Sequence, residues 1–349
     1  MCQPSKEEVI IDDNKSNSND SNKKVLYQMP KMSLFKEIIA SITLGILCGY
    51  YFIFFLVVVP LLIYGCFCLS LYIKSISGFI ILILFTFSMT PLKHKPWNYL
   101  LKSQLFNIWR EYFDYKLDAS AINEKNKLDP NGKYVFAEFP HGTFPVAQVV
   151  SASVMDEING DGKVICGLGA DAIFKFPGMR QFMSWLGVHA ANRKNITKIL
   201  NNYGRLAIIP GGIAEMYLIN EKTEEIYLKE RKGFIKAAIQ EGAGIIPCYF
   251  FGNTTLFTII GGSGSTNSFL AKVSRALKAS IMFFYGRFFL PIPYRKPLHM
   301  ICGEVIEVDK IENPTNEDID NVMTRLQVAV QKLYDEKRPS WETRPLIIK

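Results

Sequence analysis

The sequence predicts an α/β domain preceded by a helical hairpin that lies in a membrane. Two observations predict this fold class. Residues 37–92 form a long apolar region with almost no charge, and from there to residue 336 short apolar runs of strand character alternate with helical patterns. The chain has 349 residues, 49% of them hydrophobic, so it is long enough to bury a sizeable core.

The start of the chain is predicted to be a disordered tail, assigned to residues 1–30. Its stretch VIIDDNKSNSNDSNKK, residues 9–24, is polar and rich in Asn and Ser after its first residues. Such a segment offers too few apolar side chains to offset the entropy of ordering.

The hairpin is assigned to residues 31–92. Its two charge-free runs contain 36 residues (38–73) and 18 residues (75–92). A straight helix of the first length would extend about 54 Å, against a hydrocarbon core of about 30 Å, so the first run must break. We expect the break at Pro60 or Gly65, and the two spans near residues 38–59 and 70–90.

Lysines flank both ends of this region and place both ends in the cytoplasm by the positive-inside rule: Lys23, Lys24, Lys31 and Lys36 before it, and Lys93, Lys95 and Lys102 after it. A hairpin satisfies that arrangement. The alternative, a buried hairpin of a soluble protein, is disfavoured because such long charge-free runs seldom remain soluble. The remaining residues, 93–349, are assigned to one cytosolic domain.

The domain is predicted to have a mixed or parallel sheet flanked by helices. The expected strands are residues 133–139, 163–167, 205–210, 244–251 and 298–308. The expected helices are 143–157, 177–187, 196–203, 231–241 and 317–336. A further helical pattern, 97–114, carries Trp and Lys just after the hairpin, which suits either the lipid headgroup layer or the core.

The net charge of +8 and the pI of about 9.0 favour an anionic partner, and the apolar region argues against nucleic acid. The seven cysteines are odd in number and show neither zinc spacing nor a disulfide framework. We therefore expect reduced, cytosol-facing thiols and no metal.

His141 lies in EFPHGTFP, residues 138–145, at the predicted carboxyl end of a strand. Ligands bind at that edge of α/β sheets, and a nearby helix amino terminus would lower the pKa of the ring and keep it neutral. A neutral imidazole is suited to take a proton from a hydroxyl group. The alternative is a histidine of a tight turn that is bonded only to a backbone carbonyl. No G-x-S-x-G or H-E-x-x-H pattern offers another route.

Four further stretches accompany this histidine: FPGMR (176–180), IPGGIAEMY (209–217), RKGFIKAAIQEGAGIIPCYFFG (231–252) and FYGRFFLPIPYRKPLHMICGEVI (284–306). Their order and spacing resemble the type-2 diacylglycerol acyltransferase family, which includes monoacylglycerol acyltransferases and wax synthases. The resemblance implies an acyltransferase-like domain that moves an acyl group from acyl-CoA to a lipid hydroxyl. It also implies an endoplasmic reticulum membrane protein, with lipid droplets as a second location.

The family's His-Pro-His-Gly becomes Phe139, Pro140, His141 and Gly142, so the first histidine is missing and the catalytic one is kept. The other positions that match the family are Pro177, Arg180, Gly211, Gly212, Glu215, Arg231, Gly233, Phe234, Pro247, Phe251, Gly252, Pro293, Pro297 and Gly303. The aspartate that related glycerolipid acyltransferases carry five residues after the histidine is Val146 here. The local His/Asp dyad is therefore absent.

The resulting hypothesis is direct transfer with His141 as general base. Glu215 is the expected partner of the ring, and the amides near Gly142 and Thr143 are expected to bind the oxyanion. Arg231, Lys232 and Arg180, with Arg193 behind them, are the expected ligands of the coenzyme A phosphates. Pro140, Gly211, Gly212, Gly233 and Phe234 complete the expected substrate site.

Several alternatives stay open. Glu215 has a structural reading as a helix cap or ion-pair residue, and each cation has one as a surface charge. The acceptor is diacylglycerol, the commonest in the family, or else a monoacylglycerol or a fatty alcohol. No cofactor is expected, because acyl-CoA is a substrate, and the oligomeric state is open, with a homo-oligomer among the expectations. The alternative of a different class is a non-catalytic lipid-binding protein on the same scaffold.

Overall fold

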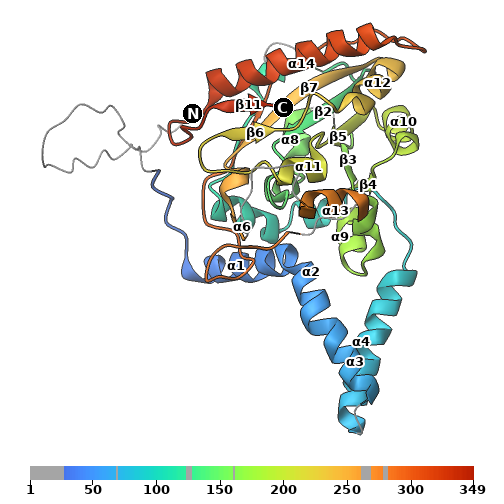
Figure 1. Cartoon of the computed structure of the whole chain (residues 1–349), viewed down its shortest axis with the longest axis vertical. Coiled ribbons are helices and arrows are strands. Elements are labelled where there is room, and N and C mark those ends of the chain that lie inside the picture. Colours follow the sequence, from blue (N-terminus) through green and yellow to red (C-terminus); the bar gives the residue numbers. More distant parts are fainter. Residues whose placement is uncertain (1–26, 68–69, 123–127, 160–161, 261–268, 278–281) are drawn as a thin grey trace, which may run out of the picture.

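A mixed seven-stranded sheet forms the centre of the molecule (Figure 1). The computed structural model describes residues 27–67, 70–122, 128–159, 162–260, 269–277 and 282–349, so most of the predicted disordered tail lies outside the described residues. The sheet order is β1-β10-β7-β2-β5-β3-β4, and β10 runs antiparallel to β7 while the other neighbours are parallel. The predicted α/β class with a mixed sheet is confirmed.

The strands of this sheet are β1 (Lys116–Asp118), β2 (Lys133–Phe139), β3 (Cys166–Gly169), β4 (Val188–Ala190), β5 (Arg205–Ile208), β7 (Ala243–Phe251) and β10 (His299–Cys302). The central strands β2 and β7 are covered on both faces, which explains why they are almost continuously apolar in sequence. Two small sheets join β6 (Glu224–Ile226) to β11 (Leu346–Ile348) and β8 (Thr258–Ile259) to β9 (Phe284–Tyr285).

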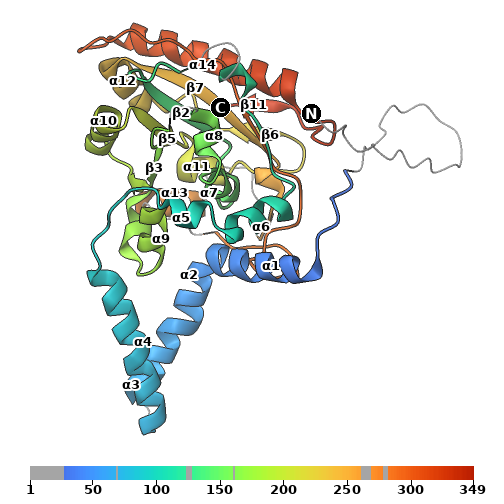
Figure 2. The ribbon, with the colours of Figure 1, turned by 180° about the vertical axis from the view of Figure 1, so that it is seen from behind.

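Helices cover both faces of the sheet (Figures 1 and 2). One face packs against α10 (Arg193–Asn202), α12 (Lys232–Glu241) and α14 (Asn316–Lys337). The other packs against α1 (Leu34–Cys48), α6 (Gln104–Tyr112), α7 (Val146–Ser151) and α9 (Met179–Trp185). The shorter helices are α5 (Asn98–Leu101), α8 (Met155–Asn159), η3 (Asp171–Lys175), α11 (Gly212–Met216), η4 (Asn253–Thr255) and α13 (Phe269–Leu277).

Strand β2 divides its side chains between the two faces. Val135, Ala137 and Phe139 pack with the helices α10, α12 and α14, whereas Tyr134 and Phe136 pack on the face of α6 and α7. Because successive side chains of a strand alternate, Glu138 belongs to the face of Tyr134 and Phe136. This assignment matters for the site described below.

The apolar region forms five helical segments: α1, α2 (Tyr50–Ile53), the π-helix η1 (Phe54–Val58), α3 (Val59–Phe67) and α4 (Leu71–Met89). Among the described residues α4 alone is long and apolar enough to cross a membrane, and α1 with residues 50–65 passes the same test only as a pair bent by 67°. Segments α3 and α4 lie side by side and project from the domain (Figures 1 and 2).

The break in the first apolar run was predicted at the wrong residue. It lies at Gly49, because α1 packs on the domain with Leu44 and Cys48 buried, and a side chain at Gly49 would meet the ring of Pro291 at 2.5 Å. Pro60 is accommodated inside the helical path, directly after the π-helix η1. The span predicted at residues 38–59 is therefore divided between α1 and the segments α2 and η1, which lead into α3.

The helical pattern 97–114 is a core element, the second of its two interpretations. It is split into α5 and α6, and Phe106, Trp109 and Tyr112 of α6 are buried. The indole N–H of Trp109 donates to the Thr43 hydroxyl of α1 at 2.9 Å. Helix α1 instead carries exposed apolar side chains, including Leu34 and Phe35.

Candidate active site

His141 follows β2 directly, as predicted, and its ring is held by its own turn. The imidazole Nδ1 lies 2.9 Å from the Gly142 carbonyl oxygen. A carbonyl oxygen only accepts hydrogen bonds, so Nδ1 carries the proton and Nε2 keeps a free lone pair. Burial lowers the pKa of His141, and this effect outweighs the bond to Gly142, which raises it. The ring is therefore a neutral base at pH 7.

Glu215 reaches His141 by a different contact from the one expected. Its Oε2 accepts the backbone N–H of His141 at 2.8 Å, and its Oε1 accepts the backbone N–H of Tyr227 at 3.0 Å. The carboxyl group thus fixes the loop that carries the histidine and leaves the ring to Gly142. Burial raises the pKa of Glu215 to about 8, and the two amide bonds and Arg231 act in the opposite direction.

The diglycine before Glu215 allows this close approach. A side chain at Gly211 would collide with the Glu215 carboxyl group, and Gly212 has a φ of +53°, in the left-handed region. Arg231 closes the cluster, since its Nη2 donates to the Gly211 carbonyl at 2.9 Å and its guanidinium lies 4.9 Å from the centre of the Tyr227 ring.

Gly142 is required by both space and backbone conformation. Its φ is +69°, and a side chain there would lie 2.7 Å from Nδ2 of Asn253. That amide donates to the carbonyl oxygens of Pro140 at 3.1 Å and His141 at 2.9 Å, while its Oδ1 accepts the N–H of Ala147 at 3.2 Å. Asn253 therefore ties the histidine loop to the start of α7.

A cavity of about 870 Å³ opens beside this cluster. His141, Arg231 and Gln148 line it together with an apolar wall, and it reaches Pro96 and Asn98 just after the apolar region. A space of this size and character suits a ligand with long apolar chains and a few polar atoms. The histidine and the segment that follows α4 thus share one cavity.

The cluster unites Pro140, His141, Gly142, Gly211, Gly212, Glu215 and Arg231 of the predicted site residues. The others lie elsewhere. Arg180 donates to the Ser88 carbonyl at the end of α4, and the exposed Lys232 forms an ion pair with Asp320 of α14 at 2.5 Å. Gly233 is exposed, and Phe234 is buried in the core on the opposite face of the sheet.

Among the cations expected to bind phosphate, Arg231 lines the cavity, whereas Arg180, Lys232 and Arg193 are not part of its wall. Arg193 donates to the Gln240 side chain instead. The Nε of Arg231 is buried and has no hydrogen-bond partner among the described residues. Arg231 therefore retains donor capacity toward a ligand.

The sequence reasoning missed Asn253, Gln148 and the amide of Tyr227. Asn253 follows Gly252 at the carboxyl end of β7, next to β2, and this position was a signal that could have found it. Gln148 donates to the Pro140 carbonyl at 2.8 Å. Glu138 also lines the cavity.

Within the described part of the chain no group of three or more His, Cys, Asp or Glu side chains is placed to hold a metal ion. Cys48, Cys166, Cys248 and Cys302 are free thiols and buried.

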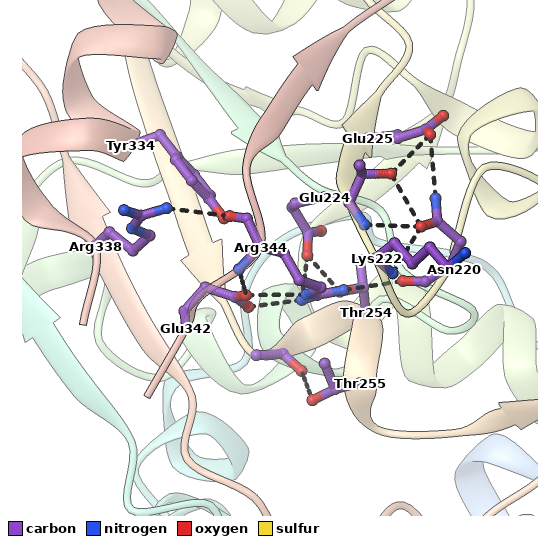
Figure 3. Close-up of polar contacts among 12 residues, drawn as sticks. Asn220, Lys222, Glu224, Glu225, Thr254, Thr255, Tyr334, Arg338, Glu342 and Arg344 are labelled. Atoms are coloured by element: carbon purple, nitrogen blue, oxygen red, sulfur yellow. Dashed lines mark hydrogen bonds and ion pairs between the residues drawn. The ribbon is translucent and has the colours of Figure 1, made fainter. Parts of the chain in front are cut away.

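Arg344, two residues before β11, is held beside Glu224 and Glu342 by ion pairs (Figure 3). Arg344 donates to Glu342 at 2.6 Å and to the Thr254 hydroxyl at 3.1 Å, and it forms an ion pair with Glu224, the first residue of β6. Strand β11 then pairs with β6 in parallel. Tyr227 follows β6 immediately, so the pairing of β6 with β11 ends one residue before the amide that donates to Glu215.

Comparison with known proteins decides the family. The family model described as diacylglycerol acyltransferase matches residues 66–349, most of the chain. The chain belongs to the diacylglycerol acyltransferase family. The predicted resemblance is therefore confirmed, and the protein is an acyltransferase-family member.

Two relatives of this family have different names. The chain is 28% identical over 261 residues to a human protein named acyl-CoA wax alcohol acyltransferase 2, covering 70% of this chain and 77% of the relative. It is 28% identical over 248 residues to diacylglycerol O-acyltransferase 2 of Dictyostelium discoideum, covering 67% and 74%. A solved 1-acyl-sn-glycerophosphate acyltransferase from Thermotoga maritima matches with a TM-score of 0.39 and 10% identity, covering 88% of this chain and all of that one.

Proposed function

We propose that this protein transfers the acyl group of acyl-CoA to the hydroxyl group of diacylglycerol, with His141 as the general base. The observation that carries the proposal is the state of the ring: Nδ1 is bonded to the Gly142 carbonyl oxygen, and the neutral side chain lines the cavity of about 870 Å³. Nε2 is then the atom that takes the hydroxyl proton.

In the proposed reaction the hydroxyl oxygen attacks the thioester carbonyl carbon while its proton moves to Nε2 of His141. The carbonyl oxygen becomes an oxyanion, and the C–S bond then breaks as the imidazolium returns the proton to the sulfur of coenzyme A. Atoms and charge balance without a covalent acyl-enzyme.

The amides of Gly142 and Thr143 are the proposed donors to the oxyanion. Both residues are buried, and neither amide has a hydrogen-bond acceptor among the described residues. Unpaired buried N–H groups beside the base are what oxyanion stabilisation requires. Arg231, with its unpaired Nε, is the proposed contact for a phosphate of coenzyme A.

Diacylglycerol is placed first because the matching family is named for it, while the relative named for wax alcohol supports a fatty alcohol as the second candidate. Monoacylglycerol is the third. We further propose that the projecting segment with α3 and α4 enters the endoplasmic reticulum membrane from its cytosolic side. The cavity would then open toward lipid through Pro96 and Asn98.

The test is transfer of labelled acyl-CoA by the full-length protein in membranes, offered diacylglycerol, monoacylglycerol and a fatty alcohol separately. The expected result is label in triacylglycerol, lost with His141→Ala at equal protein level. Labelled wax ester alone would replace the proposed acceptor, and no labelled product from any acceptor would favour the non-catalytic lipid-binding alternative.

A further inference from the structure

Glu138 is a buried carboxyl group that the proposed mechanism does not use. It is the residue before Phe139 in β2, and its side chain is 4% exposed. Its Oε1 is buried without a hydrogen-bond partner, and no ion pair or hydrogen bond to its carboxyl group exists among the described residues. An unpaired buried carboxyl group destabilises a fold, so its place in the cavity wall calls for a ligand.

Among the residues that the structure describes, no cation forms an ion pair with Glu138. Burial is the cause that raises its pKa, to about 8, and no basic group lowers it. Glu138 contributes to the raised pKa values of two side chains, Tyr115 and Cys248. Both pKa values lie well above their ordinary values, so both side chains are neutral at pH 7. At pH 7 the carboxyl group is mainly protonated. It can then both donate one hydrogen bond and accept another.

Glu138 and His141 share one cavity although they come from different faces of the local strand pattern. They are three residues apart, so their Cα atoms are at most about 11 Å from each other. Both residues line the cavity of about 870 Å³. A ligand in this cavity whose hydroxyl group reaches His141 can therefore also contact Glu138 through a second polar group.

We propose that Glu138 binds a second oxygen atom of a glycerol-based acceptor, the ester carbonyl or free hydroxyl next to the hydroxyl group that reacts. This inference rests on the proposed acyl transfer to a lipid alcohol and adds a polar subsite to it. A glycerolipid carries such an oxygen on the adjoining carbon, whereas a fatty alcohol has none. Glu138 thus selects glycerolipids over simple alcohols, because a buried group built to pair with an oxygen is left unpaired by an alcohol that lacks it.

The experiment compares wild type, Glu138→Gln and Glu138→Met, each as the full chain in membranes, with diacylglycerol, monoacylglycerol and hexadecanol as acceptors. We expect Glu138→Met to lower kcat/KM for the two glycerolipids about ten- to hundredfold relative to hexadecanol. Glu138→Gln should keep most of the preference, since a neutral amide also donates and accepts. Equal changes for all three acceptors, or none, would overturn the proposal.

A second measurement separates this proposal from the acyl transfer itself. The melting temperature of each variant is recorded with monoacylglycerol and with hexadecanol, without acyl-CoA. We expect monoacylglycerol to raise the melting temperature of the wild type more than that of Glu138→Met, and hexadecanol to raise both equally. An equal rise of both melting temperatures with monoacylglycerol would overturn the subsite. If monoacylglycerol stabilises the wild type more than Glu138→Met, but the wild type forms no ester, the proposed reaction is wrong and the subsite stands. Glu138→Met also removes an unpaired buried group, so it should fold at least as well as wild type.

Discussion

Gly142 shows at the residue scale how the loop depends on a missing side chain. We expect Gly142→Ala to destabilise the protein by roughly 1–2 kcal/mol or more, because φ is +69° and the added carbon would press on the Asn253 amide at 2.7 Å. The measurement is the unfolding temperature of the detergent-solubilised protein. The matched control is Gly233→Ala on α12, where nothing lies within 4 Å, and an equal loss in both variants would contradict the explanation.

Glu215 gives a second prediction at this scale. Its two oxygens each accept a backbone N–H, so Glu215→Gln supplies one acceptor for two donors. We expect a loss of about 1–3 kcal/mol and faster hydrogen exchange at the amides of His141 or Tyr227. Unchanged exchange at both amides would show that the carboxyl group does not hold the loop.

The residue scale also shows where sequence reasoning stopped. Gly142, Gly211 and Glu215 were found from spacing and resemblance, and the structure brings them together. The partner of Glu215 could not be found, because a bond from a side chain to a distant backbone amide leaves no pattern in sequence. Lys232 was predicted at the site because it is next to Arg231 in sequence. It is the first residue of α12, and its side chain forms an ion pair with Asp320 of α14 instead.

At the scale of elements, the strand β2 was predicted with its exact bounds since Gly132 and Pro140 limit a clear apolar run. Strand β10 is shorter than the predicted 298–308. Its pairing ends near Gly303, whose N–H donates to the Pro247 carbonyl at 2.8 Å. The three-residue strands β1, β4, β6 and β11 were missed because so few residues cannot establish a period of two.

The ion pairs of Arg344 near the C-terminal strand yield a prediction for an element. Arg344→Met would leave Glu224 and Glu342 buried without their cation, and we expect a loss of about 3–5 kcal/mol. The control is Lys332→Met, which removes an exposed pair with Glu336 and should change stability by less than about 1 kcal/mol. Chemical unfolding of both variants is the measurement, and similar midpoints would contradict the role of these ion pairs.

At the scale of the whole molecule, buried carboxyl groups link stability to pH. The pKa values of Glu138 and Glu215 are raised by burial to about 8, so the folded state binds more protons than the unfolded state between about pH 4.5 and pH 8. The contribution of these two groups to stability therefore falls as pH rises through this window. We expect a lower unfolding temperature at pH 8.5 than at pH 6.

Two variants test whether this pH dependence comes from the buried carboxyl groups. Glu138→Gln should show a smaller decrease in unfolding temperature between pH 6 and pH 8.5, because the amide stays neutral at both values of pH. Glu336→Gln, on the exposed surface of α14, should keep the slope of the wild type. An unfolding temperature that rises from pH 6 to pH 8.5 would show that these two groups are ionised in the fold.

The mixed α/β architecture of the domain could be predicted from hydrophobic runs, but the position of the break in the first apolar run could not. Gly49 ends α1 because of Pro291, 242 positions later in the chain. The run of apolar residues around Gly49 gives no sign of that contact. Docking of α1 on the domain is a tertiary effect, and it leaves the shorter segment with α3 and α4 to project (Figure 1).

The central claim is that Nε2 of His141 takes the proton of the lipid hydroxyl. Its most direct test is the rate of acyl transfer per folded protein for wild type, His141→Gln and the control His299→Gln, from pH 5 to pH 9. His299 lies on β10 and is not part of the cavity wall. The account predicts a loss on the order of 10²–10⁴-fold for His141→Gln and little change for His299→Gln.

Because burial lowers the pKa of His141, the loss of rate that comes from protonation of the ring should begin below the ordinary histidine pKa of about 6.5. A rate for His141→Gln within tenfold of the wild type at every pH would contradict the claim and leave His141 as a residue of the turn.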